Sequence, residues 1–182
     1  MTSTATKGHT VRFLSHFRPG CRGFLHGLAV LLLGSTLLLP MLANAAMLAP
    51  GAAFPALTID DQHGKPLRID GETQLVIFTA DMAAGDFVKE VLHAQAPGTL
   101  EQLHAIYLSD ISGMPSLITR MVALPKLREL PFAVGIGRDA AQLADLPRQS
   151  GAASVVQLQG GKVTAIGYVR DAAQLRQALG LR

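Results

Sequence analysis

Two aspartates, Asp81 and Asp110, are the side chains of this sequence best placed to do chemistry. Each closely follows an apolar segment that is typical of a β-strand. Open α/β sheets bind ligands just beyond the carboxyl ends of their strands, so both aspartates, with Asp86 and Ser112 nearby, are candidates for a small polar or cation-binding site. The simpler interpretation is that Asp81 caps the next helix and Asp110 caps a turn, because aspartate is a preferred capping residue.

Methionines next to these positions suggest an apolar site as well. Methionine is flexible and suits surfaces that adapt to a partner, so Met82, Met114 and Met121 could line a groove. Filling of the core is the more common role of this residue. Met82 directly follows Asp81 and is the methionine that we include among the candidate binding residues.

The histidines after residue 45 do not form a metal-binding pattern. They are predicted to lie on a turn, a helix and a strand: His63, His93 and His104. No two of them have the His-x-x-x-His spacing that places two imidazoles on one helix face. We expect surface or structural roles for them and no metal site.

Residues 135–140 match the Gly-x-Gly-x-x-Ala pattern of dinucleotide-binding sites. That motif needs a complete βαβ unit, with an acidic residue about 20 positions further on. Here Pro147 interrupts the helix, and the corresponding strand ends in Gln157-Leu158. We therefore expect no dinucleotide and no other cofactor.

The first 45 residues have the features of a secretory signal peptide. Four basic residues precede any acidic one, an apolar run follows at 27–42, and Ala43-Asn44-Ala45 supplies the small residues of a cleavage site. The alternative is an uncleaved N-terminal anchor, because the run extended to Ala49 is long enough to span a bilayer. Pro40, and the absence of a basic stop-transfer residue before Lys65, favour cleavage and a periplasmic location.

Cleavage after Ala45 would change the composition in ways that exclude several functions. Residues 1–45 carry four basic and no acidic residues, so their removal lowers the net charge from +3 to −1. They also contain Cys21, the only cysteine, which excludes disulfides, Cys-ligated zinc and thiol catalysis from the mature chain. A weakly acidic protein is a poor match for nucleic acid. We expect a lead-in at 46–55 and one soluble, monomeric domain at 56–182, without a membrane span.

The expected domain alternates strands and helices and then ends in an antiparallel hairpin and a helix. Alternating apolar residues predict a hairpin at 56–70, and the continuous apolar run at 74–79 is typical of a central, fully buried strand. Spacings of three and four residues predict helices from 84 and from 117, the second of which Pro125 should kink or stop. The other expected elements are strands at 103–109, 132–136 and 154–169, the last folded back at Gly160-Gly161, and helices at 139–146 and 171–179. This order predicts an α/β fold with a mixed sheet.

The order of elements, together with three short motifs, resembles the thioredoxin-like superfamily in its redoxin and thiol-specific antioxidant branch. The motifs are the opening Phe54–Leu67, the strand Leu75–Ala80 that precedes the family's active site, and the hairpin Ser154–Val163. The resemblance covers nearly all of the chain after residue 45. It implies a three-layer fold, with a mixed central sheet, helices on both faces and an N-terminal β-hairpin extension. In such a fold the strands that precede Asp81 and Asp110 are parallel neighbours.

The active-site cysteines of that superfamily are missing from this sequence. Its Trp-Cys-x-x-Cys motif aligns with Met82, Ala83 and Asp86 at the tryptophan and the two cysteine positions. In the alternative peroxiredoxin alignment Thr79 matches, and Met82 replaces the reactive cysteine. Ala152-Ala153-Ser154 stands where a cis-proline is expected. The resemblance is therefore to an exported member without thiol chemistry.

These features predict an exported thioredoxin-like domain without thiol redox chemistry that acts as a binding or accessory module in the periplasm, with a periplasmic protein as its candidate partner. The candidate binding residues are Asp81, Met82, Asp86, Asp110 and Ser112, and no residue is assigned a catalytic role. The alternative is an enzyme of the oxidoreductase type that uses a non-thiol cofactor or a metal at the same strand ends. Asp81 and Asp110 are its candidate residues.

Overall fold

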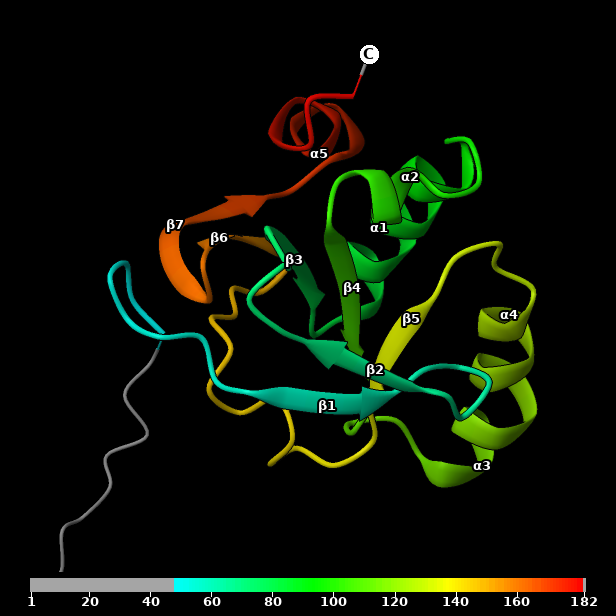
Figure 1. The fold of residues 1–182 in the computed structure, drawn as a ribbon. Coiled ribbons are helices and arrows are strands. Elements are labelled where there is room, and N and C mark those ends of the chain that lie inside the picture. The colour runs from blue at the N-terminus through cyan, green and yellow to red at the C-terminus, as the bar shows by residue number, and fades with distance from the viewer. Residues whose placement is uncertain (1–47, 182) are drawn as a thin grey trace, which may run out of the picture. The chain divides into compact units, whose positions relative to one another are not determined.

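A five-stranded sheet with the order β5-β4-β3-β6-β7 forms the centre of the protein (Figure 1). The computed structural model describes residues 48–181, so the predicted leader at 1–45 lies outside the described residues. The strands of this sheet are β3 (Leu75–Thr79), β4 (Ala105–Asp110), β5 (Val134–Gly137), β6 (Ala153–Gln159) and β7 (Lys162–Val169). A separate two-stranded sheet pairs β1 (Leu57–Asp60) with β2 (Pro66–Ile69).

Strand directions confirm the predicted mixed sheet. β4 runs parallel to both β3 and β5, whereas β6 runs antiparallel to β3 and to β7. Every residue of β3 is buried, as expected for a continuous apolar strand at the centre of a sheet. The β6–β7 hairpin turns at Gly160 and Gly161, whose φ angles of 57° and 75° lie in the left-handed region that favours glycine.

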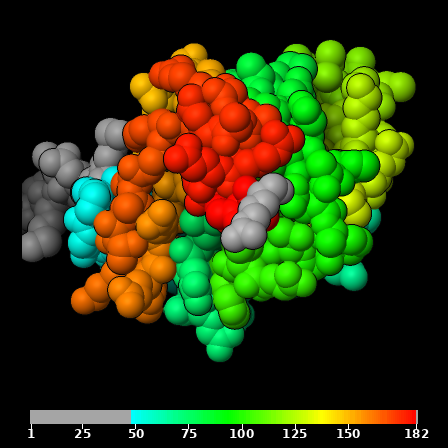
Figure 2. Space-filling view, turned by 90° about the horizontal axis from the view of Figure 1, so that it is seen from above, coloured from blue at the N-terminus to red at the C-terminus, as the bar shows by residue number. Residues whose placement is uncertain are grey.

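Two helices cover one face of the sheet. Ile77 of β3 shares a buried apolar cluster with Val88 of α1 (Met82–His93) and Leu175 of α5 (Ala172–Ala178). The short helix α2 (Thr99–Gln102) joins α1 to β4. Seen from above, α5 lies between the orange residues of β7 and green residues that include α1 (Figure 2). No helix within residues 48–181 has the length and apolar character needed to cross a membrane.

The β1–β2 hairpin covers the opposite face. Ile59 and Ile69 pack there with Val76 and Phe78 of β3, and Leu48, Leu143 and Leu146 complete this second cluster. Gln62, in the turn of the hairpin, is 1% exposed, and its amide group bonds the backbone of Phe132 and Val134 at β5. These contacts confirm the predicted α/β class, with three layers and an N-terminal hairpin, but within residues 48–181 the layer opposite α1 and α5 consists of the hairpin and turns instead of helices.

A single helix from Ser116 to Arg128 lies beside the β5 edge. It consists of α3 (Ser116–Ile118), the π-helical turn η1 (Thr119–Ala123) and α4 (Leu124–Arg128). It therefore continues through Pro125. Proline lacks an N–H and clashes with the carbonyl four residues earlier, and the wider π-helical turn directly before it relieves this conflict. Leu127 fixes the helix to the sheet by packing against Ile111 and Ile136.

The helix predicted at 139–146 is wrong, because this segment forms turns. Asp139 Oδ1 accepts a hydrogen bond from Ala141 N, and Gln142 Oε1 accepts bonds from the N–H groups of Arg138 and Asp139. Side chains that bond the nearby backbone in this way compete with helix formation. Leu143 and Leu146, which lie in this segment, are buried against the sheet although no helix forms.

The glycines of the Gly-x-Gly pattern lie in β5 and have a packing role. A Cβ atom on Gly135 would be 2.6 Å from Leu108 Cδ2 and 2.8 Å from Ile59 Cγ2. A Cβ atom on Gly137 would be 2.5 Å from Leu143 Cδ1. Glycine is thus needed at both positions because the hairpin and the turn segment press directly on this strand.

Candidate functional site

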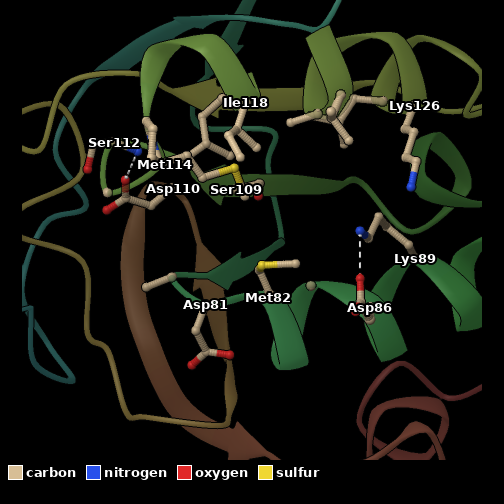
Figure 3. Close-up of a pocket in the computed structure, with 18 of the residues that line it drawn as sticks. Asp81, Met82, Asp86, Lys89, Ser109, Asp110, Ser112, Met114, Ile118 and Lys126 are labelled. Carbon is tan, nitrogen blue, oxygen red and sulfur yellow. Dashed lines mark hydrogen bonds and ion pairs between the residues drawn. The ribbon is translucent and has the colours of Figure 1, made fainter. Parts of the chain in front are cut away.

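A pocket of about 760 Å³ opens at the carboxyl ends of β3 and β4, between α1 and the helix Ser116–Arg128 (Figure 3). Parallel pairing of β3 with β4 places the residues that follow each strand at the same edge of the sheet. All five residues singled out from the sequence line this pocket: Asp81, Met82, Asp86, Asp110 and Ser112. The five residues are therefore neighbours in space, as their positions after parallel strands predict.

Asp81 fixes the start of α1 and the loop before β6. Its Oδ1 accepts a hydrogen bond of 2.9 Å from Ala84 N, which is the N-cap bond of α1. Its Oδ2 accepts a bond of 2.8 Å from Gly151 N. In Figure 3 the carboxylate points away from Met114 and Ile118. The capping interpretation of Asp81 is thus correct, and both of its oxygens are in use.

Asp110 is also held by its surroundings. Oδ1 accepts a hydrogen bond of 3.0 Å from Ser112 N, and Oδ2 lies 3.3 Å from Arg148 Nη1. The Asp110 side chain is only 5% exposed, so this ion pair compensates a largely buried charge. Arg148 also stacks 5.5 Å from the centre of the Phe78 ring. Both aspartates therefore act as structural acceptors, and residues 48–181 contain no group of three metal-ligating side chains.

The walls of the pocket are apolar and largely open to solvent. Met82 on α1 is 68% exposed, and Ile118 and Val122 on the facing helix are 49% and 45% exposed. Met114 is half-buried and also lines the pocket. Met82 and Met114 thus line one cavity, as the groove hypothesis expects, whereas Met121 is exposed and lies outside it.

Three charged side chains form one end of the pocket. Lys89 Nζ lies 2.9 Å from Asp86 Oδ1, one turn apart on α1. Lys126, on the facing helix, is exposed and has no ion-pair partner within residues 48–181. Both lysine side chains extend toward the space between the two helices (Figure 3). This end of the pocket therefore carries a net positive charge.

Buried hydroxyl groups lie beneath the first turns of α1. Tyr107 is 1% exposed, and its hydroxyl is 3.0 Å from Thr79 Oγ1. Burial, with a smaller contribution from the charge of Asp86, raises the pKa of Tyr107 to about 12, against the effect of its hydrogen bonds to Thr79 and Ser109. Tyr107 therefore stays neutral at physiological pH and supports this side of the pocket.

The loop before β6 contains no cis peptide bond, and neither does any other part of residues 48–181. Ser154 Oγ donates a hydrogen bond to the carbonyl of Pro147, and Ala152 N donates to Gln149 O. With the bond from Gly151 to Asp81, these contacts hold the loop next to the start of α1. Hydrogen bonds thus fix the conformation of the loop at Ala152-Ala153-Ser154, where the family resemblance implies a cis-proline.

The sequence did not reveal several residues that complete the pocket. The missed charged residues are Lys89, Lys126 and Arg148, and the missed apolar residues are Ile118 and Val122. The last two were noticed only as part of a helical pattern. Their role depends on the π-helical turn, which has no clear signal in the sequence apart from Pro125.

The strand order, the central buried strand and the C-terminal antiparallel hairpin match the order that the family resemblance implies. The fold is thioredoxin-like. No family model and no curated protein matches the chain. Met82, Ala83 and Asp86, aligned with the tryptophan and cysteine positions of the superfamily, lie in the first turns of α1.

Several solved structures have a similar fold. A peroxidoxin, BcpB, from Mycobacterium tuberculosis is 15% identical, with 73% of this chain and 95% of that chain covered and a TM-score of 0.49. A putative thiol:disulfide interchange protein, DsbE, from Chlorobium tepidum is 15% identical, with coverage of 73% and 99% and a TM-score of 0.48. A thio-disulfide isomerase from Thermus thermophilus is 19% identical, with coverage of 74% and 99% and a TM-score of 0.44. These similarities concern the fold and assign no activity to this chain.

Proposed function

We propose that this protein is an exported thioredoxin-like domain that binds a protein partner in the periplasm without thiol chemistry. The observation that carries the proposal is the strand-end pocket, which has exposed apolar walls formed by Met82, Ile118 and Val122. Exposed apolar side chains around a concave surface favour binding of apolar groups. A polypeptide segment that inserts an apolar side chain between α1 and the facing helix suits this pocket.

The absence of thiol chemistry follows from the position of the cysteine. Cys21 is the only cysteine, and it precedes the predicted cleavage site after Ala45. A processed chain then has no thiol, and methionine cannot replace one because it cannot form a thiolate. Export is supported by the basic start, the apolar run and the Ala43-Asn44-Ala45 motif. N-terminal sequencing of protein recovered from the periplasm should begin at Ala46.

Site-specific cross-linking in cells tests the binding role. A photo-cross-linking phenylalanine analogue replaces Met82 in one full-length variant and Tyr168 in a control variant. Both side chains are exposed, at 68% and 41%, but only Met82 lines the pocket. We expect a discrete adduct with another protein from position 82 and none from position 168.

A variant that fills the pocket makes this test specific. Ala80 is exposed and lines the pocket, so Ala80→Phe adds volume there without disturbing the core. We expect this substitution to abolish the adduct from position 82 while the thermal unfolding temperature stays within about 2 °C of wild type. An adduct that persists in the Ala80→Phe variant, or that forms equally well from position 168, would refute partner binding in this pocket.

A further inference from the structure

The helix Ser116–Arg128 presents an exposed apolar ridge that the pocket does not use. Residues four apart align along this helix, because the π-helical turn holds more residues than an α-helical turn. One row, Thr119, Ala123 and Leu127, is buried or half-buried and faces the protein. Ile118, Val122 and Lys126 line the pocket. Leu117, Met121 and Pro125 form the outer ridge, all three are exposed, and none of them lines the pocket.

The side chains of the ridge are unusually open to solvent. Leu117 is 66% exposed and Met121 is 70% exposed, which makes Met121 the most exposed large apolar side chain among residues 48–181. Figure 1 places this helix at the side of the molecule, beyond the β5 edge, with no other element covering it. A flat membrane surface can therefore approach the ridge without a clash.

Positive charge surrounds the ridge on both sides. Arg120 and Arg128 belong to the row on one side, and Lys126 belongs to the row on the other. All three are exposed and none forms an ion pair within residues 48–181, but Arg128 Nε donates a hydrogen bond of 3.1 Å to the carbonyl of Gln62, which leaves Arg120 and Lys126 as the cations free to reach a surface. The helix contains no acidic residue. An apolar ridge with cations on each side is the arrangement of a helix that lies in a membrane interface, where long basic side chains reach the headgroups.

We propose that the outer ridge docks on a lipid bilayer that carries anionic headgroups. Leu117 and Met121 would enter the boundary between headgroups and acyl chains, while the side chains of Arg120 and Lys126 reach the anionic headgroups from either side. A second copy of this chain fits less well, because a two-fold contact of the ridge with itself would bring the basic side chains together, and the helix itself carries no carboxylate to pair with them. The apolar part of this surface is separate from the pocket, since neither Leu117 nor Met121 lines it, whereas Lys126 lies at the border between the two.

The chain contains no tryptophan, so single-tryptophan variants report on one position each. Met121→Trp places the probe on the ridge, and Tyr168→Trp places it on β7 as a matched exposed control. Each full-length variant is mixed with vesicles of phosphatidylglycerol and phosphatidylcholine, with or without bromine on the acyl chains, and with vesicles of phosphatidylcholine alone. In anionic vesicles we expect a blue shift of the emission at position 121 and quenching by the brominated lipid. The probe at position 168 should show neither effect.

Charge variants provide a second measurement. In the Met121→Trp background, Arg120→Gln and Lys126→Gln should each weaken binding to anionic vesicles by about fivefold, as expected for one basic residue near such a surface. The proposal is overturned if the probe at position 121 is not quenched by the brominated lipid, or if it is quenched equally in neutral vesicles. A blue shift that depends on protein concentration and needs no lipid would also overturn it, in favour of self-association.

Discussion

The hydrogen bond between Asp81 and Gly151 joins the start of α1 to the loop before β6, and its contribution to stability can be measured against an internal reference. Asp81 and Asp171 are both N-caps with extended backbone, and each accepts a cap bond from the residue three positions on, at 2.9 Å and 2.8 Å. Only Asp81 also accepts a bond from a distant backbone N–H. The comparison of Asp81→Ala with Asp171→Ala therefore isolates that bond.

The expected magnitudes follow from this geometry. Loss of an N-cap costs about 1 kcal/mol, which is the effect expected for Asp171→Ala. Asp81→Ala also removes a hydrogen bond to a charged acceptor, worth about 1.5 kcal/mol because Gly151 is only half-buried, for a total of about 2.5 kcal/mol. With a urea dependence of about 2 kcal/mol per M, the unfolding midpoint should fall by about 0.5 M for Asp171→Ala and about 1.2 M for Asp81→Ala. Equal midpoints for the two variants would refute the role of the Gly151 bond.

Three further predictions concern the core and the pocket. Gly135→Ala should lower the free energy of unfolding by about 1–3 kcal/mol in urea titration, because its Cβ would clash with Leu108 and Ile59. As a control, Gly113→Ala should change the free energy of unfolding by less than about 0.5 kcal/mol, because its Cβ meets nothing within 4 Å. Burial raises the folded-state pKa of Tyr107 to about 12, above its ordinary value of 10.0, so wild type should lose about 2 kcal/mol of folding free energy as the pH rises from 10 to 12. Tyr107→Phe should lack this loss, and parallel pH profiles of the two proteins would contradict the burial argument. Arg148→Met should cost about 1–3 kcal/mol in thermal or urea unfolding, because the largely buried Asp110 loses its cation, and an unchanged stability would show that water replaces the guanidinium.

Local patterns in the sequence predicted the centre of the fold well. The apolar run of β3, the hairpins at both ends and the caps Asp81 and Asp171 are each specified by a few adjacent residues. The gathering of the five candidate residues around one pocket followed from their positions after parallel strands. These features were predictable because backbone conformation and strand burial leave a direct trace in residue type.

Features that depend on distant contacts were not predictable in this way. The sequence predicts a helix at 139–146, but this segment forms turns, and the sheet surface buries its Leu143 and Leu146. The four apolar residues whose spacing predicts the helix near Pro125 are all exposed: Leu117, Ile118, Met121 and Val122. The π-helical turn changes the face of this helix that meets the sheet, and Leu127 takes the buried position instead. Lys89, Lys126 and Arg148 come from separate elements, so only the folded chain brings them to one cavity.

The segment before β1, residues 48–56, covers part of the β7 edge and so affects how the protein behaves in concentrated solution. Gly51 N donates to Val163 O, Val163 N donates to Ala52 O, and Phe54 N donates to Gly161 O. These bonds occupy backbone groups on the outer edge of β7 that would otherwise be free to pair with another chain. A proteolytic cut between Phe54 and Leu57 would release this segment together with the buried Leu48. The trimmed protein would keep its pocket but expose part of the β7 edge, and so would gain a tendency to aggregate by pairing that edge side by side with a strand of another molecule.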